Sequence, residues 1–303
     1  MKTPKSLSPL VRGGVIDEVL RPLMSGKEAA VYVVRTPEGI ACAKVYKDAI
    51  HRNFHNRAQY MEGRLQQDSR QARAMEKGSR YGRQELEQAW RTAEVEALFR
   101  LAEAGVRVPK PLAFVHGVLL MELVVDECGE PAPRLIDVPL DEEGALRLHA
   151  ALCQDIVRML CVGVVHGDLS EYNVLVTPAG PVIIDLPQHV DSALNNNARA
   201  LFERDVDHLA TFLGRFAPTL RTTDYAREIW DLYEKGLLHP GTKLTGRYER
   251  VEKVSDVEGV LEAIADAADE AAARMGLAPV EGHQVKPSRR QGRRNRKRQG
   301  RWD

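Results

Sequence analysis

The strongest constraint on the fold of this chain is a stretch in its second half where short apolar runs enclose polar residues. It reads V-V-H-G-D-L-S-E-Y-N-V-L-V over residues 164–176, and V-I-I-D follows over residues 182–185. The apolar runs have the length and the β-branched content of short buried strands. The polar residues at their ends include His166, Asp168, Asn173 and Asp185. Such a cluster predicts a chemical site at the strand ends or, alternatively, a hairpin that these residues only cap.

The types and order of these residues suit phosphoryl transfer. That reaction needs a carboxylate to orient the attacking hydroxyl, and an amide with a second carboxylate to hold Mg²⁺ on the phosphates. The spacing H-x-D-x-x-x-x-N over residues 166–173 is that of the catalytic loop of protein kinases. Asp185 follows twelve residues after Asn173, at the end of an apolar run. Because that combination is rare by chance, we predict a catalytic site here.

Two strands are predicted near the start of the chain. The apolar segments 29–36 and 40–46 are joined by Pro37-Glu38-Gly39, a turn signal. Lys44 lies inside the second segment, where a lysine is unusual unless it is paired or reaches solvent. In kinases, a strand lysine holds the α- and β-phosphates and pairs with a helix glutamate. The alternative is an edge-strand lysine that points to water.

A long helix that could supply the glutamate is predicted over residues 83–104. Apolar residues recur there at intervals of three and four, and Gly105 gives a C-terminal signal. Glu94 borders the apolar stripe and is the first candidate for the partner of Lys44, with Glu96 the second. Either side chain could instead be a solvated helix carboxylate.

A loop that covers phosphates is predicted just before the two strands. Gly26 permits a tight turn with close approach of the backbone to a ligand. Ser25 and Lys27 flank it and would offer a hydroxyl and a positive charge. A typical kinase has three glycines here, whereas this chain has one, and S-G-K also occurs in ordinary turns.

These segments together resemble the RIO family of atypical serine/threonine kinases, over about residues 20–215, and fit a bacterial member. S-G-K-E and D-L-S-E-Y-N are specific to that family rather than to kinases at large. The chain lacks the D-F-G and A-P-E motifs of ordinary kinases, as do RIO kinases. The matching segments are S-G-K-E-A-A-V-Y at 25–32, A-K-V-Y-K at 43–47, M-E-L at 121–123, H-G-D-L-S-E-Y-N at 166–173 and I-I-D-L-P-Q-H-V at 183–190.

The resemblance implies ATP and Mg²⁺, with Mn²⁺ as a substitute, and it implies a role for each site residue. Asp168 would be the catalytic aspartate, and Asp185 would bind metal and could also accept the phosphoryl group. Asn173 would be the other metal ligand. The remaining residues would bind the nucleotide: Ser25, Gly26, Lys27, Lys44 and Glu94 at the phosphates, and Glu122 and Leu123 in the hinge that holds the adenine.

The same resemblance implies an α+β, two-lobed protein-kinase-like fold. It has a small antiparallel sheet, a mainly helical second lobe, and neither activation loop nor peptide-docking subdomain. The expected parts are an extension (1–14), an N-lobe (15–123) with a flexible insert at about 48–82, a C-lobe (124–278) and a disordered basic tail (279–303).

Two details of the C-lobe follow from the residues themselves. Asp141 is placed to cap a helix that runs to about Cys161. A later helix carries Arg204, Asp205 and Asp207, which either tie it to the catalytic loop or are plain surface charges.

The composition fits an enzyme of the cytoplasm. No apolar run of the length that a membrane span needs occurs, and the start of the chain lacks the apolar segment of a signal peptide. The four cysteines show no C-x-x-C spacing, so we expect reduced thiols rather than disulfides or a zinc site.

The formal charge of zero hides an asymmetry. Residues 286–303 hold nine Lys or Arg and one Asp, a net charge of +8, and the other residues carry −8. Such a block is typical of a disordered segment that binds nucleic acid. The alternatives are a solubilising tail or one that folds back on the acidic body. The family resemblance also indicates RNA or a ribosomal particle as a partner.

The predicted function is therefore phosphoryl transfer from ATP, as a serine/threonine kinase that also acts on itself, or chiefly as an ATPase in maturation of the small ribosomal subunit. A small-molecule phosphotransferase of the aminoglycoside or choline kinase type is the alternative, because those enzymes share H-G-D-x-x-x-x-N.

Overall fold

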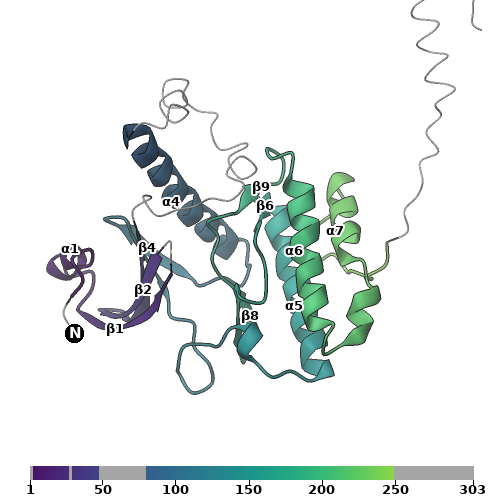
Figure 1. Cartoon of the computed structure of the whole chain (residues 1–303), viewed down its shortest axis with the longest axis horizontal. Helices are drawn as coiled ribbons and strands as arrows, with labels where there is room; N and C mark the ends of the chain where they lie inside the picture. Colours follow the sequence, from purple (N-terminus) through teal and green to yellow (C-terminus); the bar gives the residue numbers. More distant parts are fainter. Residues whose placement is uncertain (1–2, 27–28, 48–79, 249–303) are drawn as a thin grey trace, which may run out of the picture. The chain divides into compact units, whose positions relative to one another are not determined.

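The computed structural model describes residues 3–26, 29–47 and 80–248, with side chains described from residue 91 in the last range. Lys27, nearly all of the predicted insert at 48–82 and the tail at 279–303 lie outside the described residues. The described part is a two-lobed α+β structure in which the small lobe precedes the helical one (Figure 1). The predicted fold class is confirmed.

The small lobe is built on a five-stranded antiparallel sheet in the order β1-β2-β3-β5-β4. The predicted hairpin is present, since Thr36 pairs with Gly39 around a turn at Pro37-Glu38. A second tight turn follows β4, where His116 and Gly117 both adopt positive φ angles (52° and 75°), as hairpin turns of this kind require. The strands are β1 (Glu18–Ser25), β2 (Ala29–Thr36), β3 (Gly39–Tyr46), β4 (Pro111–Val115) and β5 (Val118–Glu122).

The two faces of this sheet pack against different helices. Alternate residues of a strand point to opposite faces, so Ala41 and Ala43 of β3 pack under the N-terminal segment, where Leu7 and Leu10 are fully buried. That segment contains the short helix α1 (Ser8–Arg12). The first residues of the chain thus complete the small lobe.

The opposite face of the sheet packs against the long helix α4 (Arg80–Glu103), which appears in dark blue in Figure 1. Val95, Leu98 and Leu101 of α4 belong to the same buried cluster as Leu119 of β5. The sequence predicted this helix within three residues at each end. Its apolar stripe fixes its rotation, and the rotation turns Glu94 toward the sheet.

In its described part, the helical lobe packs three α-helices around two short antiparallel strand pairs. The first, α5 (Glu142–Cys161), begins as predicted at Asp141, whose side chain accepts a hydrogen bond from the Gly144 amide at 2.7 Å. The others are α6 (Ala198–Leu213) and α7 (Tyr225–Glu234), which lie beside α5 (Figure 1). The strand pairs are the hairpin of β7 (Val174–Thr177) with β8 (Gly180–Ile183), and β6 (Val164–Val165) with β9 (Val190–Asp191), which enclose that hairpin in the sequence.

The start of α7 is marked by its own cap. A 3-10 helix (Pro218–Thr222) comes first, and Asp224 then caps α7 through the Arg227 amide. No helix in the described ranges is both long enough and apolar enough to cross a membrane.

Candidate active site

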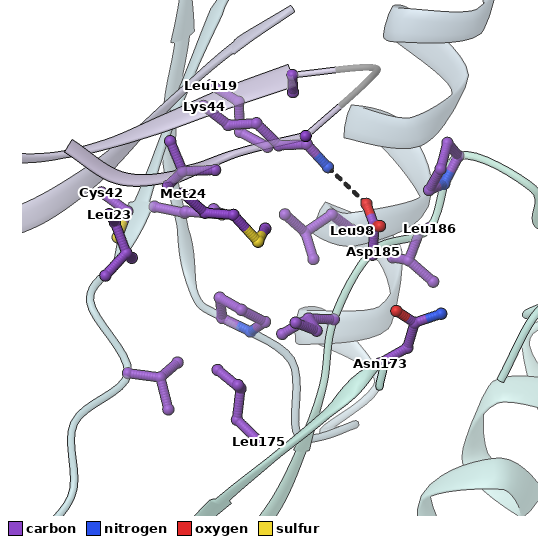
Figure 2. Close-up of a pocket in the computed structure, with 18 of the residues that line it drawn as sticks. Leu23, Met24, Cys42, Lys44, Leu98, Leu119, Asn173, Leu175, Asp185 and Leu186 are labelled. Atoms are coloured by element: carbon purple, nitrogen blue, oxygen red, sulfur yellow. Dashed lines mark hydrogen bonds and ion pairs between the residues drawn. The ribbon is translucent and has the colours of Figure 1, made fainter. Parts of the chain in front are cut away.

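A cavity of about 630 Å³ lies where β1, β3 and β5 of the small lobe face β7 and the segment after β8. Its upper wall includes Leu23, Met24 and Cys42, and Leu175 lies opposite (Figure 2). Polar residues gather at the end where Lys44 points toward the second lobe (Figure 2). The cavity is thus apolar in one half and charged in the other, which suits a ligand with a flat ring and an anionic tail.

Lys44 is the centre of the charged end. Its Nζ donates to Glu94 Oε1 at 2.6 Å and to Asp185 Oδ1 at 3.0 Å (Figure 2 shows the second contact). The side chains of Lys44 and Glu94 are 12% and 7% exposed. The strand places Lys44 on the cleft face, one position from Ala43 on the other face. Burial of a lysine together with two carboxylates costs desolvation free energy. Such a group is therefore expected to be retained for a function.

The charges around Lys44 set the protonation of the group. Burial alone would lower the pKa of Lys44, but the carboxylates of Glu94 and Asp185 hold that pKa well above its usual value. In return, Lys44 lowers the pKa of Asp185 against the opposing effect of burial. At neutral pH the site therefore holds a cation and an anion side by side, as binding of phosphate and metal requires.

Asp185 has an unusual backbone. Its φ angle is 68°, in the left-handed region, where aspartate is tolerated better than most residues. The turn directs its carboxylate into the cleft, while the carbonyl of the preceding Ile184 accepts a hydrogen bond from His166 Nε2 at 3.0 Å. Backbone strain of this kind is concentrated at functional sites.

The catalytic-loop residues predicted from the sequence line the same cavity. Asn173 Nδ2 donates to the carbonyl of Asp168 at 2.8 Å, which fixes the two residues relative to each other. Partial burial raises the pKa of Asp168, and the nearby charges of His166 and Arg204 oppose that effect.

Helix α6 is hydrogen-bonded to the catalytic loop. The buried carboxylate of Asp205 accepts a 2.7 Å hydrogen bond from the amide of Gly167, and Arg204 donates to the Gly167 carbonyl. The predicted tie between this helix and the catalytic loop is therefore made by Arg204 and Asp205. The described hydrogen bonds give Asp207 no such contact.

The predicted phosphate loop follows β1. Ser25 is the last residue of that strand, and the Gly26 amide donates to the Ala29 carbonyl at 2.9 Å, which closes the turn. Lys47, just after β3, donates to Ser25 Oγ at 3.1 Å and to the Gly26 carbonyl at 2.6 Å. Sequence reasoning assigned Lys47 no role. Its position in the A-K-V-Y-K segment was the available signal.

The predicted hinge lies at the end of β5. Glu122 is the last residue of this strand, and both its backbone and its side chain contact the Lys110 backbone, since the Glu122 amide donates to the carbonyl and Oε2 accepts from the amide. Leu123 and Val124 continue along the cavity wall. In the described structure no hydrogen bond uses the Val124 amide. That amide is a further donor at the apolar end of the cavity that the sequence did not single out.

Two predicted ligands are compatible with Mg²⁺. Asn173 donates through Nδ2 and keeps Oδ1 for a metal, and Asp185 keeps a second carboxylate oxygen beside its contact with Lys44. Among the described residues no cluster of three or more His, Cys, Asp or Glu side chains could hold a metal ion. This donor set nevertheless fits Mg²⁺, which is usually held by one or two protein groups together with nucleotide phosphates.

A two-lobed fold with this lysine–glutamate pair, catalytic loop and aspartate defines a protein-kinase-like enzyme. Comparison with known proteins identifies the family. The model of the RIO domain matches residues 30–226. The chain belongs to the RIO family, as the sequence resemblance predicted.

Several relatives carry the names of RIO kinases. The Haloferax volcanii protein named RIO-type serine/threonine-protein kinase Rio1 is 34% identical over 210 residues, which is 68% of this chain and 67% of that relative. The Methanocaldococcus jannaschii protein of the same name is 31% identical over 71% of this chain and 69% of its own length. The human serine/threonine-protein kinase RIO1 is 30% identical over 76% of this chain but only 39% of its own length. The similarity to the human protein is thus confined to less than half of that protein.

Proposed function

We propose that this protein transfers the γ-phosphoryl group of ATP to a serine or threonine hydroxyl, on protein partners and on itself. The observation that carries the proposal is the position of Lys44 between Glu94 and Asp185, in a cavity that Asp168 and Asn173 also line. This set contains a cation for the phosphates, an amide and a carboxylate for metal, and a carboxylate for the acceptor.

The residues divide the work along the cavity. The apolar half and the backbone of Glu122 to Val124 would hold the adenine, and Lys44 would hold the α- and β-phosphates. The acceptor oxygen attacks the γ-phosphorus, its proton passes toward Asp168, and the bond from that phosphorus to the oxygen of ADP breaks. Mg²⁺ or Mn²⁺ held by Asn173 and Asp185 would neutralise charge on the phosphates.

A variant of this activity uses Asp185 itself as the acceptor. Its carboxylate is ionised and faces the charged end of the cavity. Attack on the γ-phosphorus would give an acyl phosphate and ADP, and water would then release phosphate, which amounts to ATP hydrolysis.

The biological setting is a further part of the proposal. We place the protein in the cytoplasm, acting on a ribosomal particle or another RNA–protein partner. The nine basic residues of 286–303 support a nucleic acid contact, and the four cysteines, all free thiols, suit a reducing compartment.

The decisive experiment incubates the purified protein with γ-labelled ATP and Mg²⁺ and follows protein-bound label and free phosphate. Acid-stable label on Ser or Thr supports the kinase. Label that hydroxylamine removes, and that Asp185→Asn lacks, supports the acyl phosphate. Failure to bind ATP, or transfer to an aminoglycoside or choline in place of protein, would overturn the proposal.

A further inference from the structure

Tyr46, the last residue of β3, brings a hydroxyl to the charged end of the cavity. The residue is only 9% exposed, and within the described part of the chain its hydroxyl oxygen is buried without a hydrogen-bond partner. Buried polar groups are almost always paired, so an exception of this kind indicates a partner that arrives in another state of the protein.

The surroundings of Tyr46 are the residues that bind the phosphates. Lys44 lies two positions earlier on the same face of β3, and its Nζ is 5.6 Å from the centre of the Tyr46 ring. The guanidinium carbon of Arg91, one turn before Glu94 on α4, is also 5.6 Å from that centre. The ring is therefore held between two cations, which fixes where its hydroxyl points.

Glu94 is the acceptor within reach of that hydroxyl. Burial raises the pKa of Tyr46, and both the negative charge of Glu94 and the approach of its carboxylate to the hydroxyl raise that pKa further, with a smaller contribution from Asp185. The described hydrogen bonds give the buried Glu94 carboxylate one donor, Lys44, although a carboxylate can accept several. The Tyr46 hydroxyl and this under-used acceptor thus lie close enough to affect each other, although their contact does not reach hydrogen-bond geometry in this structure.

Lys44 divides its charge between Glu94 and Asp185 in this structure. Phosphates that bind Lys44 would draw its ammonium group along the cleft, and Glu94 must follow to remain paired. We propose that Tyr46 is a positioning residue of this site, whose hydroxyl donates to Glu94 in the nucleotide-bound protein and keeps that carboxylate directed at Lys44. The inference rests on the proposed function, because it requires that Lys44 binds phosphates.

Tyr46→Phe tests the idea because it removes one oxygen and keeps the ring. Calorimetric titration with ATP, ADP and adenosine should show roughly three- to tenfold weaker binding of ATP and ADP, the loss expected for one hydrogen bond to a charged group. Adenosine, which has no phosphate, should bind as before. In the transfer assay the KM for ATP should rise more than kcat falls. The melting temperature of the free protein should stay the same or rise, because no hydrogen bond is lost in that state.

The matched control is Tyr32→Phe. Tyr32 pairs with Ala43 on the neighbouring strand and packs on the opposite face of the same sheet, so the same chemical change there should leave nucleotide binding unaltered. A second control repeats Tyr46→Phe in a Glu94→Gln background, where the effect should shrink because a neutral acceptor forms a weaker hydrogen bond.

Three results would overturn the inference. Equal binding of ATP and ADP by Tyr46→Phe and the unchanged protein would show that the hydroxyl does nothing. Weaker binding of ATP alone would mean a contact with the terminal phosphate, and an undiminished effect in Glu94→Gln would exclude Glu94 as the partner. An unchanged protein that binds neither nucleotide would instead overturn the proposed function, and this inference with it.

Discussion

The ammonium nitrogen of Lys44 lies 3.0 Å from Oδ1 of Asp185, so a residue of β3 and the residue two positions after β8 are joined across the cleft. The pair has a consequence for ligand binding. Under the proposed function, nucleotide phosphates would compete with the Asp185 carboxylate for Lys44, and a metal would compete with Lys44 for Asp185. ATP and Mg²⁺ together would relieve both conflicts, since each would take one member of the pair.

Asp185→Asn should separate binding from catalysis. Asn tolerates the positive φ angle at this position, so the turn should persist. Removal of the negative charge frees Lys44, and ATP without metal should bind at least as tightly as to the unchanged protein. The increase in affinity that Mg²⁺ brings should disappear, and phosphoryl transfer should fall by about 10² or more.

Titration of ATP with and without Mg²⁺ checks this prediction, and Lys44→Met provides the opposite case, in which ATP binding is weakened under both conditions. Retention of the full Mg²⁺ effect in Asp185→Asn would show that Asp185 holds no metal.

Asp168→Asn should abolish transfer and preserve ATP binding, because Asp168 is assigned to the acceptor hydroxyl.

Partial burial raises the pKa of Asp168. A base must be deprotonated, so kcat/KM should fall as the pH falls through that raised pKa, above the ordinary value of about 3.9. A pH–rate profile measures the position of this limb. A profile that stays flat down to pH 4 would contradict the role of Asp168 as the base.

Asp205→Ala should slow catalysis, although Asp205 itself is assigned no contact with ATP. The change removes the buried hydrogen bond between the Gly167 amide and Asp205, at a cost of about 1–3 kcal/mol in stability. Because Gly167 directly precedes Asp168, kcat should fall more than the KM for ATP changes. Asp205→Asn keeps an acceptor oxygen and should recover much of both losses. If Asp205→Asn loses as much stability and kcat as Asp205→Ala, the charge of Asp205, rather than its hydrogen bond, is what matters.

The sequence was enough to predict which residues gather in the cleft. Asp168, Asn173 and Asp185 have fixed spacings around short strands, so a local sequence pattern is enough to predict that they lie close together. The position of Glu94 beside Lys44 also followed from a helix stripe, because burial of that stripe sets the rotation of α4. Their functional roles remain predictions that the experiments above address.

Other features depend on tertiary packing that no local pattern encodes. The contact of Lys47 with Ser25 requires the register of β1, β2 and β3 together. The burial of Leu7 and Leu10 depends on a five-residue helix that begins with Ser8-Pro9, too short for a periodic signal. The free hydroxyl of Tyr46 depends on the distance between β3 and α4, which side-chain packing sets.

The basic segment 286–303 should govern binding to RNA. Deletion of this segment removes nine positive charges, so affinity for single-stranded RNA should fall and the slope of log K against log salt should flatten by about 0.7 for each lost phosphate contact. Transfer activity of the remaining chain should be unchanged. A variant that replaces the nine bases by Gln keeps the length and tests charge alone. Salt-sensitive RNA binding that survives both changes would place the RNA site elsewhere.

His149 should make the protein sensitive to mild acid. This α5 side chain is 3% exposed, its ring lies 5.0 Å from that of Tyr225, and its only described hydrogen-bond partner is the weakly polar thiol of Cys153. Burial lowers the pKa of His149 to about 4. The unfolded chain therefore takes up a proton near pH 6.5, whereas the folded protein does not until about pH 4, so stability is lost as the pH falls through that window. Between pH 7 and pH 5 the loss should be about 2 kcal/mol.

Urea unfolding at both pH values measures this loss of stability. His149→Leu should remove most of the difference, and His116→Asn, a change at an exposed turn, should not. An equal loss in all three proteins would assign the acid sensitivity to other groups.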